Sequence, residues 1–175
     1  MAVTCRLATA SDCGALAGLM HATDLHYWGD DAPPRAAFDA HVRDRVLAEP
    51  GCQVAVAERD RAVVGYACFA LLYPAPDLGG ALFMKELFVA QPARSDGIGA
   101  ALMAFIAHEA LRRGCVRLDW STEAGNAGAL RFYDRIGGTR METKVYYRVG
   151  GAALSDLAAR CGRPDSAGDA PAPRR

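Results

Sequence analysis

The sequence predicts an α/β fold of the α+β type: a mixed, mostly antiparallel central sheet of six to seven strands flanked by helices. Two observations lead to this prediction. Three strand patterns follow one another directly between residues 52 and 89, and a helix–strand–helix–strand series comes after them. A doubly wound parallel fold would alternate strands and helices throughout, and this chain does not.

Size and charge narrow the class of protein. The 175 residues are enough for one domain, expected over residues 1–160, and a flexible tail over residues 161–175, where Pro, Gly, Ala, Asp and Arg dominate. Twenty basic residues balance twenty acidic ones, which argues against nucleic acid or an anionic membrane as the main partner. Residues 1–3 do not resemble the start of a signal peptide, so we expect a soluble cytoplasmic protein.

The first 51 residues predict one strand and two helices. Residues 3–7 form the strand, and the capping-box pattern of residues 9–12 begins the first helix. That helix fades around residues 27–29. Pro33 and Pro34 open the second helix, because proline is tolerated in a first helical turn, and Pro50-Gly51 ends it.

The middle of the chain predicts three consecutive strands. Residues 52–57 and 62–73 are separated by the charged turn 58–61, which is typical of a hairpin. After a loop rich in Pro and Gly, residues 81–89 form the third strand.

The remaining elements alternate. Ile98, Leu102, Phe105 and Ile106 have helical spacing, and Gly114 closes that helix. The pattern then predicts a strand over residues 116–120, a helix over 126–136, a last strand over 143–149 and a short helix over 152–159.

The most informative segment runs from a strand through a turn into a helix that begins with Gly97 and Gly99. The amides of a first helical turn lack partners, the helix dipole is positive there, and glycine lets an anion approach the backbone. This predicts a phosphate or pyrophosphate site. No lysine follows the glycines as in a Walker A loop, and Leu102 stands where a dinucleotide fingerprint needs a small residue. Simple helix capping by the glycines remains the alternative.

Two sequence motifs indicate a resemblance to a known protein family. Arg94-x-x-Gly97-x-Gly99 matches the pattern Q/R-x-x-G-x-G/A, and residues 126–137 match N-x-x-A-x-x-F-Y-x-x-x-G about 30 residues later. Over residues 3–150 the sequence resembles the GNAT superfamily of acyl-CoA-dependent N-acetyltransferases. Residues 84–89 resemble a strand of the diamine subgroup, the spermidine- or thialysine-type acetyltransferases.

The resemblance implies acetyl-CoA as cosubstrate and no metal. It places the pyrophosphate on the turn and helix start, and the pantetheine arm between separated strands at residues 87–89 and 116–120. A backbone N–H there would act as an oxyanion hole. The expected cofactor-binding residues are Leu87, Phe88, Val89, Arg94, Ser95, Asp96, Gly97, Ile98, Gly99, Ala100, Asn126, Ala129, Phe132 and Tyr133.

Candidate catalytic residues follow from the reaction. Tyr133 matches a tyrosine that protonates the departing thiolate in many relatives, and a phenol of pKa near ~10 suits a thiol of pKa near ~8.5. An alkylamine must lose a proton before it attacks, and Glu86, Glu123 or a water relay could accept it. The alternative for Tyr133 and its neighbour Phe132 is a place in the core.

A further set of residues concerns binding of the acceptor amine. Lys85 stands where the diamine subgroup carries Glu, so either Glu86, Asp30 and Asp31 bind the amine or Lys85 pairs with a carboxylate of the substrate. Tyr27 and Trp28, beside Asp30, could hold an amine by cation–π contact, or could close the core.

We therefore expect direct transfer of an acetyl group to a primary amine of a small molecule, such as a diamine or amino acid, in a ternary complex. The alternatives are acetylation of a protein lysine or N-terminal amine, and a non-catalytic acyl-CoA-binding sensor. The resemblance also implies a homodimer.

Overall fold

The computed structural model describes residues 3–161, and the chain divides into two compact units, Met1–Gly137 and Gly138–Arg175. The first unit contains the whole sheet and four α-helices, and the second contains an extended segment and one helix.

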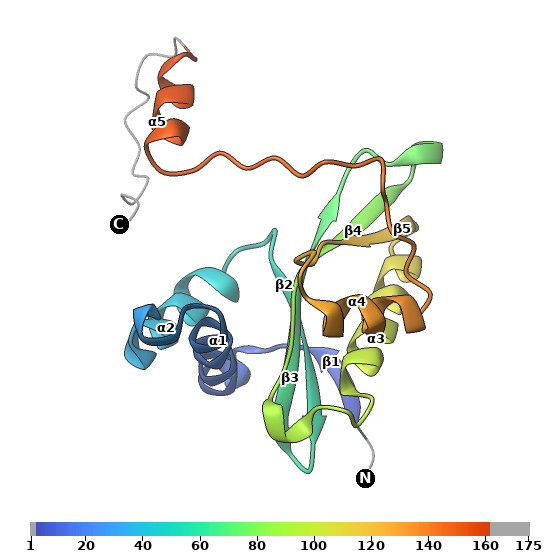
Figure 1. The fold of residues 1–175 in the computed structure, drawn as a ribbon. Helices are drawn as coiled ribbons and strands as arrows, with labels where there is room; N and C mark the ends of the chain where they lie inside the picture. Colours follow the sequence, from blue (N-terminus) through green and yellow to red (C-terminus); the bar gives the residue numbers. More distant parts are fainter. Residues whose placement is uncertain (1–2, 162–175) are drawn as a thin grey trace. The chain divides into compact units, whose positions relative to one another are not determined.

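The sheet of the first unit has five strands in the order of the sequence (Figure 1): β1 (Thr4–Leu7), β2 (Gln53–Arg59), β3 (Ala62–Leu72), β4 (Gly80–Val89) and β5 (Cys115–Trp120). Strands β1 to β4 pair antiparallel, and β4 pairs with β5 in parallel. The predicted mixed, mostly antiparallel sheet is confirmed. The strand number is five among the described residues, not six to seven.

Helices cover both faces of the sheet (Figure 1). On one face lie α1 (Cys13–Trp28) and α2 (Arg35–His41), the latter continued by the π-helical turn η3 (Val42–Val46). On the other lie α3 (Ile98–Arg112) and α4 (Ala127–Arg135). Each face has its own apolar core: one is centred on Leu16, Val42, Val56 and Tyr66, the other on Phe69, Leu82, Leu102 and Ile106.

A β-bulge in the middle of β4 changes which side chains face which helices. Cys68 of β3 pairs with Glu86, but its neighbour Phe69 pairs with Met84, so Lys85 is an extra residue in β4. Met84 packs in the α3-side core, as the regular alternation requires. After the bulge the alternation is reversed, and Phe88 packs with the α1-side core. Glu86 therefore shares the α1 side with Cys68.

The same strand separates from β5 just beyond the bulge. The parallel pairing of β4 with β5 begins at Gly80 and ends at Met84, which pairs with Trp120. Within the described residues, Leu87 to Val89 have no strand partner on that side, although the carbonyl oxygen of Val89 accepts a hydrogen bond from Nε of Arg94. The strand separation expected from the family resemblance is therefore present, and it leaves backbone groups of β4 unpaired toward β5.

The start of α1 is fixed by a buried carboxylate. Asp12 is only 5% exposed and accepts hydrogen bonds from both terminal nitrogens of Arg6, at 2.7 and 2.8 Å. It also accepts the backbone N–H of Thr9 at 2.8 Å, which is the return half of the predicted capping box. The Arg6 guanidinium and these bonds lower the pKa of Asp12 to about 2, against the effect of burial.

The second unit corrects one prediction. Residues 143–149 are extended but pair with no strand among the described residues, so the predicted sixth strand is wrong. Alternating apolar residues create only the tendency, and a strand also needs a neighbour for its N–H and C=O groups. The predicted short helix is confirmed as α5 (Ala152–Ala159).

The C-terminal residues and the length of the helices bear on two further predictions. Residues 162–175 lie outside the described residues, so the flexible tail and the domain border at residue 160 stay predictions. Among residues 3–161, no helix is both long enough and apolar enough to cross a membrane.

The Asp12 network predicts an acid-sensitive contribution to stability. Because its folded pKa is lowered, the contribution is fully present above about pH 4 and is lost as the pH falls through about 2. We expect Asp12→Asn to lower the free energy of unfolding by roughly 1–2 kcal/mol at neutral pH, allowing for the partial exposure of Arg6. Urea unfolding at several pH values measures this difference, which should shrink toward pH 2.

The matched control is Asp39→Asn, which removes a half-exposed carboxylate paired with Arg35 at 2.9 Å. Its effect should stay below about 0.5 kcal/mol. Equal losses for the two variants, or a loss for Asp12→Asn that does not depend on pH, would contradict the assignment.

Candidate active site

The turn between β4 and α3 presents unpaired backbone amides. Gly97 caps α3 with a left-handed backbone (φ 77°), and no side chain caps this end of the helix. The first helical bond joins the amide of Ala101 to the carbonyl of Gly97 at 2.9 Å, so the amides of Ile98, Gly99 and Ala100 precede it. Because these donors stand at the positive end of a 15-residue helix, they suit an anion.

Charged side chains around this turn are held in place. Arg94 donates from Nε to the carbonyl oxygen of Val89 at 3.0 Å, and its guanidinium lies 5.5 Å from the centre of the Phe88 ring. Asp96 pairs with Arg59 of β2 at 2.5 Å, which compensates its charge beside the amides. Asp96 and Arg59 also line a cavity of about 610 Å³ together with Val3 and Asp60.

The two sequence motifs meet in space at Gly99. A Cβ built on Gly99 would lie 3.3 Å from Cζ of Phe132, closer than side chains normally pack. Gly99 thus allows α3 and α4 to approach each other, which is a structural role in addition to its place in the turn with the uncapped amides. Asn126 has a local role too, because its Oδ1 caps α4 by accepting the amide of Ala129 at 3.0 Å.

Tyr133 is half-buried on α4. Its ring lies 5.2 Å from that of Trp120, at the end of β5, and 5.0 Å from that of Phe132. Burial raises its pKa to about 12, and the charges of Tyr27 and Glu86 add to the effect. The hydroxyl is therefore protonated at neutral pH and is available as a hydrogen-bond donor.

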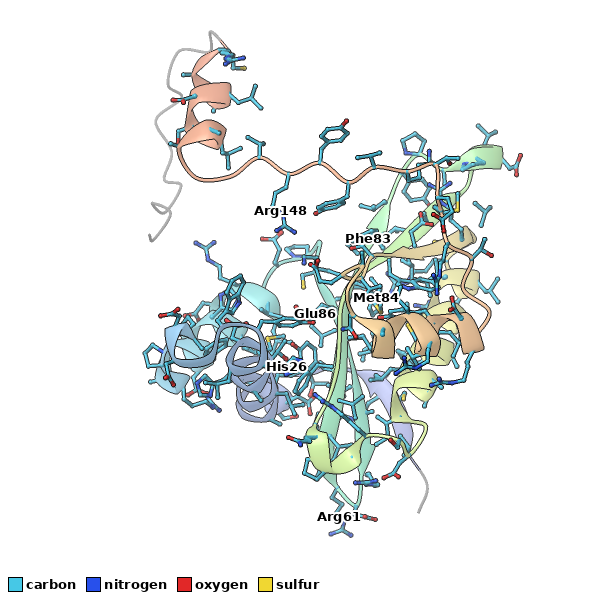
Figure 2. The ribbon with its side chains drawn as sticks, viewed as in Figure 1. His26, Arg61, Phe83, Met84, Glu86 and Arg148 are labelled. Atoms are coloured by element: carbon cyan, nitrogen blue, oxygen red, sulfur yellow. The ribbon has the colours of Figure 1, made fainter. Side chains whose placement is uncertain are left out.

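Glu86 is the half-buried carboxylate of the site. Burial raises its pKa, Lys85 partly offsets this, and Asp24 of α1 raises it further. A carboxylate with a raised pKa is a better proton acceptor at neutral pH than an ordinary one. Figure 2 labels Glu86, which belongs to β4, and its charge also acts on Tyr133.

The remaining predicted residues differ in position. Glu123 is exposed and lies in the loop after β5, where its backbone carbonyl accepts the amide of Asn126. Lys85 is exposed at the bulge. Tyr27 and Trp28 are 56% and 66% exposed at the end of α1. The alternative that these two residues close the core is therefore wrong. Asp30 follows them, exposed, in a 3₁₀ turn (Gly29–Asp31).

Sequence reasoning missed two residues of this site. Asp24 lies three residues before Tyr27, and this helical spacing could have placed both on one face of α1. For Trp120 the sequence predicts a place at the end of a strand. No local pattern indicates that its ring packs on Tyr133, because the two residues meet only through the fold. Among residues 3–161, no group of three His, Cys, Asp or Glu side chains could hold a metal ion.

Comparison with known proteins indicates the protein family to which the chain is similar. A family model described as "Acetyltransferase (GNAT) family" matches residues 19–138. The chain is 25% identical over 122 residues to the L-ornithine N5-acetyltransferase of Arabidopsis thaliana, covering 69% of this chain and 54% of that protein. It is 28% identical over 101 residues to the thialysine N-epsilon-acetyltransferase of Mus musculus, covering 56% and 59%. The chain thus spans little more than half the length of these curated relatives.

A solved structure is similar over nearly its whole length. An integron cassette protein from the mobile metagenome of V. cholerae superimposes with a TM-score of 0.85 at 35% identity, over 90% of this chain and 98% of that one. The arrangement of the strands and helices is therefore shared with an experimentally determined fold.

The position of Tyr133 predicts an unusual titration. In the folded protein, the difference in tyrosinate absorbance between the unchanged chain and Tyr133→Phe should stay near zero up to about pH 11, because the pKa is about 12. In denaturant the same difference should appear with a midpoint near ~10. Since the folded pKa is raised, the stability that Tyr133 contributes is present below pH ~10 and is lost as the pH rises through 12. A midpoint near 10 in the folded protein would disprove the burial argument.

Proposed function

We propose that this chain transfers an acetyl group from acetyl-CoA to the terminal primary amine of a small amino acid. The chain belongs to the acetyltransferase (GNAT) family and is an acyltransferase. Transfer is direct, within a ternary complex. The observation that carries the proposal is the open β4 edge, which leads from the bulge at Lys85 to the uncapped amides of α3.

The acetyl donor, acetyl-CoA, binds along this edge of β4. The amides of Ile98, Gly99 and Ala100 bind the pyrophosphate, with Ser95 and Gly97 shaping the turn and Arg94 beside it. The pantetheine amides pair with the backbone of residues 87–89, which β5 leaves free. A β4 amide there donates to the thioester oxygen and stabilises the negative charge of the tetrahedral intermediate, which is worth ~3 kcal/mol in comparable sites. Ala129 and Phe132 line the α4 side.

The acceptor needs a base. An alkylammonium of pKa near ~10.4 must lose a proton to attack, and Glu86, whose pKa burial raises above its ordinary value, accepts it. The free amine attacks the thioester carbon, a C–N bond forms and the C–S bond breaks. The sulfur leaves with the electron pair and is protonated, and one further proton passes to solvent.

Tyr133 faces the departing sulfur in this proposal. With the phenol at a pKa of about 12 and a thiol near ~8.5, complete proton transfer would be uphill by roughly 3.5 units. Tyr133 therefore acts mainly as a hydrogen-bond donor that stabilises the thiolate, and the proton that the sulfur finally keeps comes from solvent. This refines the sequence expectation of a pKa-matched acid.

Recognition of the acceptor divides between opposite charges. Asp24 and Glu86 attract the terminal ammonium, and the exposed Tyr27 and Trp28 can cover it. Lys85 is free to pair with a substrate carboxylate. This favours an amino acid with a second amine, in keeping with the named substrates of the two curated relatives, ornithine and thialysine.

Two wider features complete the proposal. The enzyme acts in the cytoplasm, where the reducing environment suits the free cysteines of the described residues. It also acts as a homodimer, as the family resemblance implies.

Donor binding is tested at the two ends of α3. Gly97 and Gly114 both have positive φ, 77° and 69°, and a Cβ at either meets no atom within 4 Å. Gly97→Ala and Gly114→Ala should therefore each cost about 1 kcal/mol of stability. Only Gly97→Ala should weaken coenzyme A binding in calorimetry, by roughly tenfold or ~1.4 kcal/mol. No heat with saturating coenzyme A, or equal affinity loss in both variants, would disprove the anion site.

Acceptor choice is tested by thiol release with a panel of amines. Ornithine and thialysine should be better substrates than alkyl diamines without a carboxylate. Lys85→Glu should raise KM roughly tenfold for the amino acids and change it little for the diamines. Arg45→Glu makes the same charge change at an exposed position of η3 and should leave both unaffected.

Other outcomes separate the alternatives. Coenzyme A binding without thiol release for any amine would favour a sensor, and transfer only to protein amines would favour a protein acetyltransferase. An amine preference unchanged by Lys85→Glu would contradict the assigned role of Lys85.

A further inference from the structure

Two cysteines lie side by side at the open end of the β2–β3 hairpin, away from its turn. Cys68 of β3 pairs with Val54 of β2, and Cys52 stands two residues before Val54. Because side chains alternate along an extended chain, Cys52 and Cys68 project from the same face of the sheet. Both pack against the same α1-side core. The contact is direct, since a hydrogen bond joins the two side chains.

The two thiols have different surroundings, although both side chains are only partly buried. The hydrogen bond from Cys68 lowers the pKa of Cys52, against the effects of burial and of Glu49. The same hydrogen bond and burial raise the pKa of Cys68, and Glu86, its partner on β4, adds to the rise. Cys52 is therefore the thiolate of the pair, and Cys68 is the thiol that donates to it. A partly exposed thiolate beside a second cysteine is the arrangement of a redox-sensitive site.

The backbone at Cys52 allows the two sulfurs to approach further. Diagonal neighbours on antiparallel strands stand roughly 7–8 Å apart at Cα, whereas a disulfide usually spans about 4.4–6.8 Å. Cys52 immediately precedes β2, and its amide donates to the carbonyl of Glu49 at 3.0 Å instead of to β3. A small shift of this residue therefore breaks no bond of the sheet. Cys13 packs against the same core, but its thiol donates to the carbonyl of Asp39 at 3.6 Å.

We propose that Cys52 and Cys68 are a redox-active pair, which a hydroperoxide oxidises to a disulfide and a small thiol reduces again. The Cys52 thiolate attacks a peroxide oxygen, so that an S–O bond forms and the O–O bond breaks. The departing hydroxide takes up a proton and becomes water. Cys68 then attacks the sulfenic acid on Cys52: the S–S bond forms, the S–O bond breaks, and the Cys68 proton leaves in a second water.

In sum, two thiols lose two electrons, and one peroxide becomes two water molecules. Such a disulfide is transient in a reducing compartment, which is how intracellular proteins use redox-sensitive pairs. It would lie beside Glu86, because Cys68 and Glu86 are opposite each other on β3 and β4. The proposal uses no step of acetyl transfer.

The experiment counts thiols in the unchanged chain. The reduced protein is treated with a small excess of hydrogen peroxide, unfolded, and alkylated with iodoacetamide. All six cysteines should be alkylated before oxidation and four after it, and a small thiol should restore six. Trypsin cleaves after Arg59 and Arg61, so Cys52 and Cys68 lie on separate peptides that the disulfide joins. Six alkylated thiols after oxidation, or a disulfide between other cysteines, would overturn the proposal.

Three variants test the assigned roles. Cys68→Ala should stop the reaction at a sulfenic acid on Cys52, which dimedone traps, and Cys52→Ala should leave Cys68 unoxidised. Cys13→Ala is the matched control from the same core and should form the disulfide as the unchanged chain does. Oxidation of Cys68 in the Cys52→Ala variant, or loss of the disulfide in Cys13→Ala, would contradict these roles. Neither measurement uses acetyl-CoA, so failure here leaves the acetyltransferase proposal standing, and the converse holds as well.

Discussion

The site depends on one irregularity, the extra residue at position 85 of β4. A regular strand would keep Met84 and Glu86 on the same face and continue its pairing with β5. The bulge moves Glu86 to the α1 side and coincides with the end of the parallel pairing at Trp120. One insertion thus yields both a carboxylate aimed away from the α3-side core and a stretch of backbone with free hydrogen-bonding groups. In an ordinary sheet such groups would be costly, and here they are the natural place for a peptide-like ligand.

The packing of Gly99 against Phe132 couples the two halves of the site. The turn that presents the amides and the helix that carries Tyr133 come from motifs about 30 residues apart, and the missing side chain at Gly99 lets them touch. Phe132 in turn packs on Tyr133, whose other neighbour is Trp120 at the end of β5. The positions of the turn with the uncapped α3 amides and of the Tyr133 hydroxyl therefore depend on the same contacts. The glycine motif therefore does more than cap α3, because Gly99 also allows α3 and α4 to pack closely.

Local signals allowed most of the fold to be predicted, and the failures share one cause. The capping box at Thr9 and Asp12, the hairpin of β2 and β3 and the helix after Gly97 depend on nearby residues, so the sequence contains the information for them. The bulge at Lys85, the ring contact of Trp120 and the nearness of Asp24 to Glu86 depend on partners distant in sequence. The sixth strand was overpredicted for the same reason: its pattern is present at residues 143–149, but the pairing that defines a strand needs another segment.

The charges around Glu86 explain how a lysine is compatible with the amine-binding site that we propose there. Lys85 and Glu86 are adjacent, but the bulge gives them different surroundings: Lys85 is exposed, and Glu86 is half-buried beside Asp24 and Tyr133. Solvent screens the ammonium of Lys85, so it only partly offsets the rise in the pKa of Glu86. A substrate with a single cationic end would gain little from Lys85. In the proposed function, the carboxylate of a zwitterionic substrate pairs with Lys85, and the distant ammonium of that substrate pairs with Asp24 and Glu86.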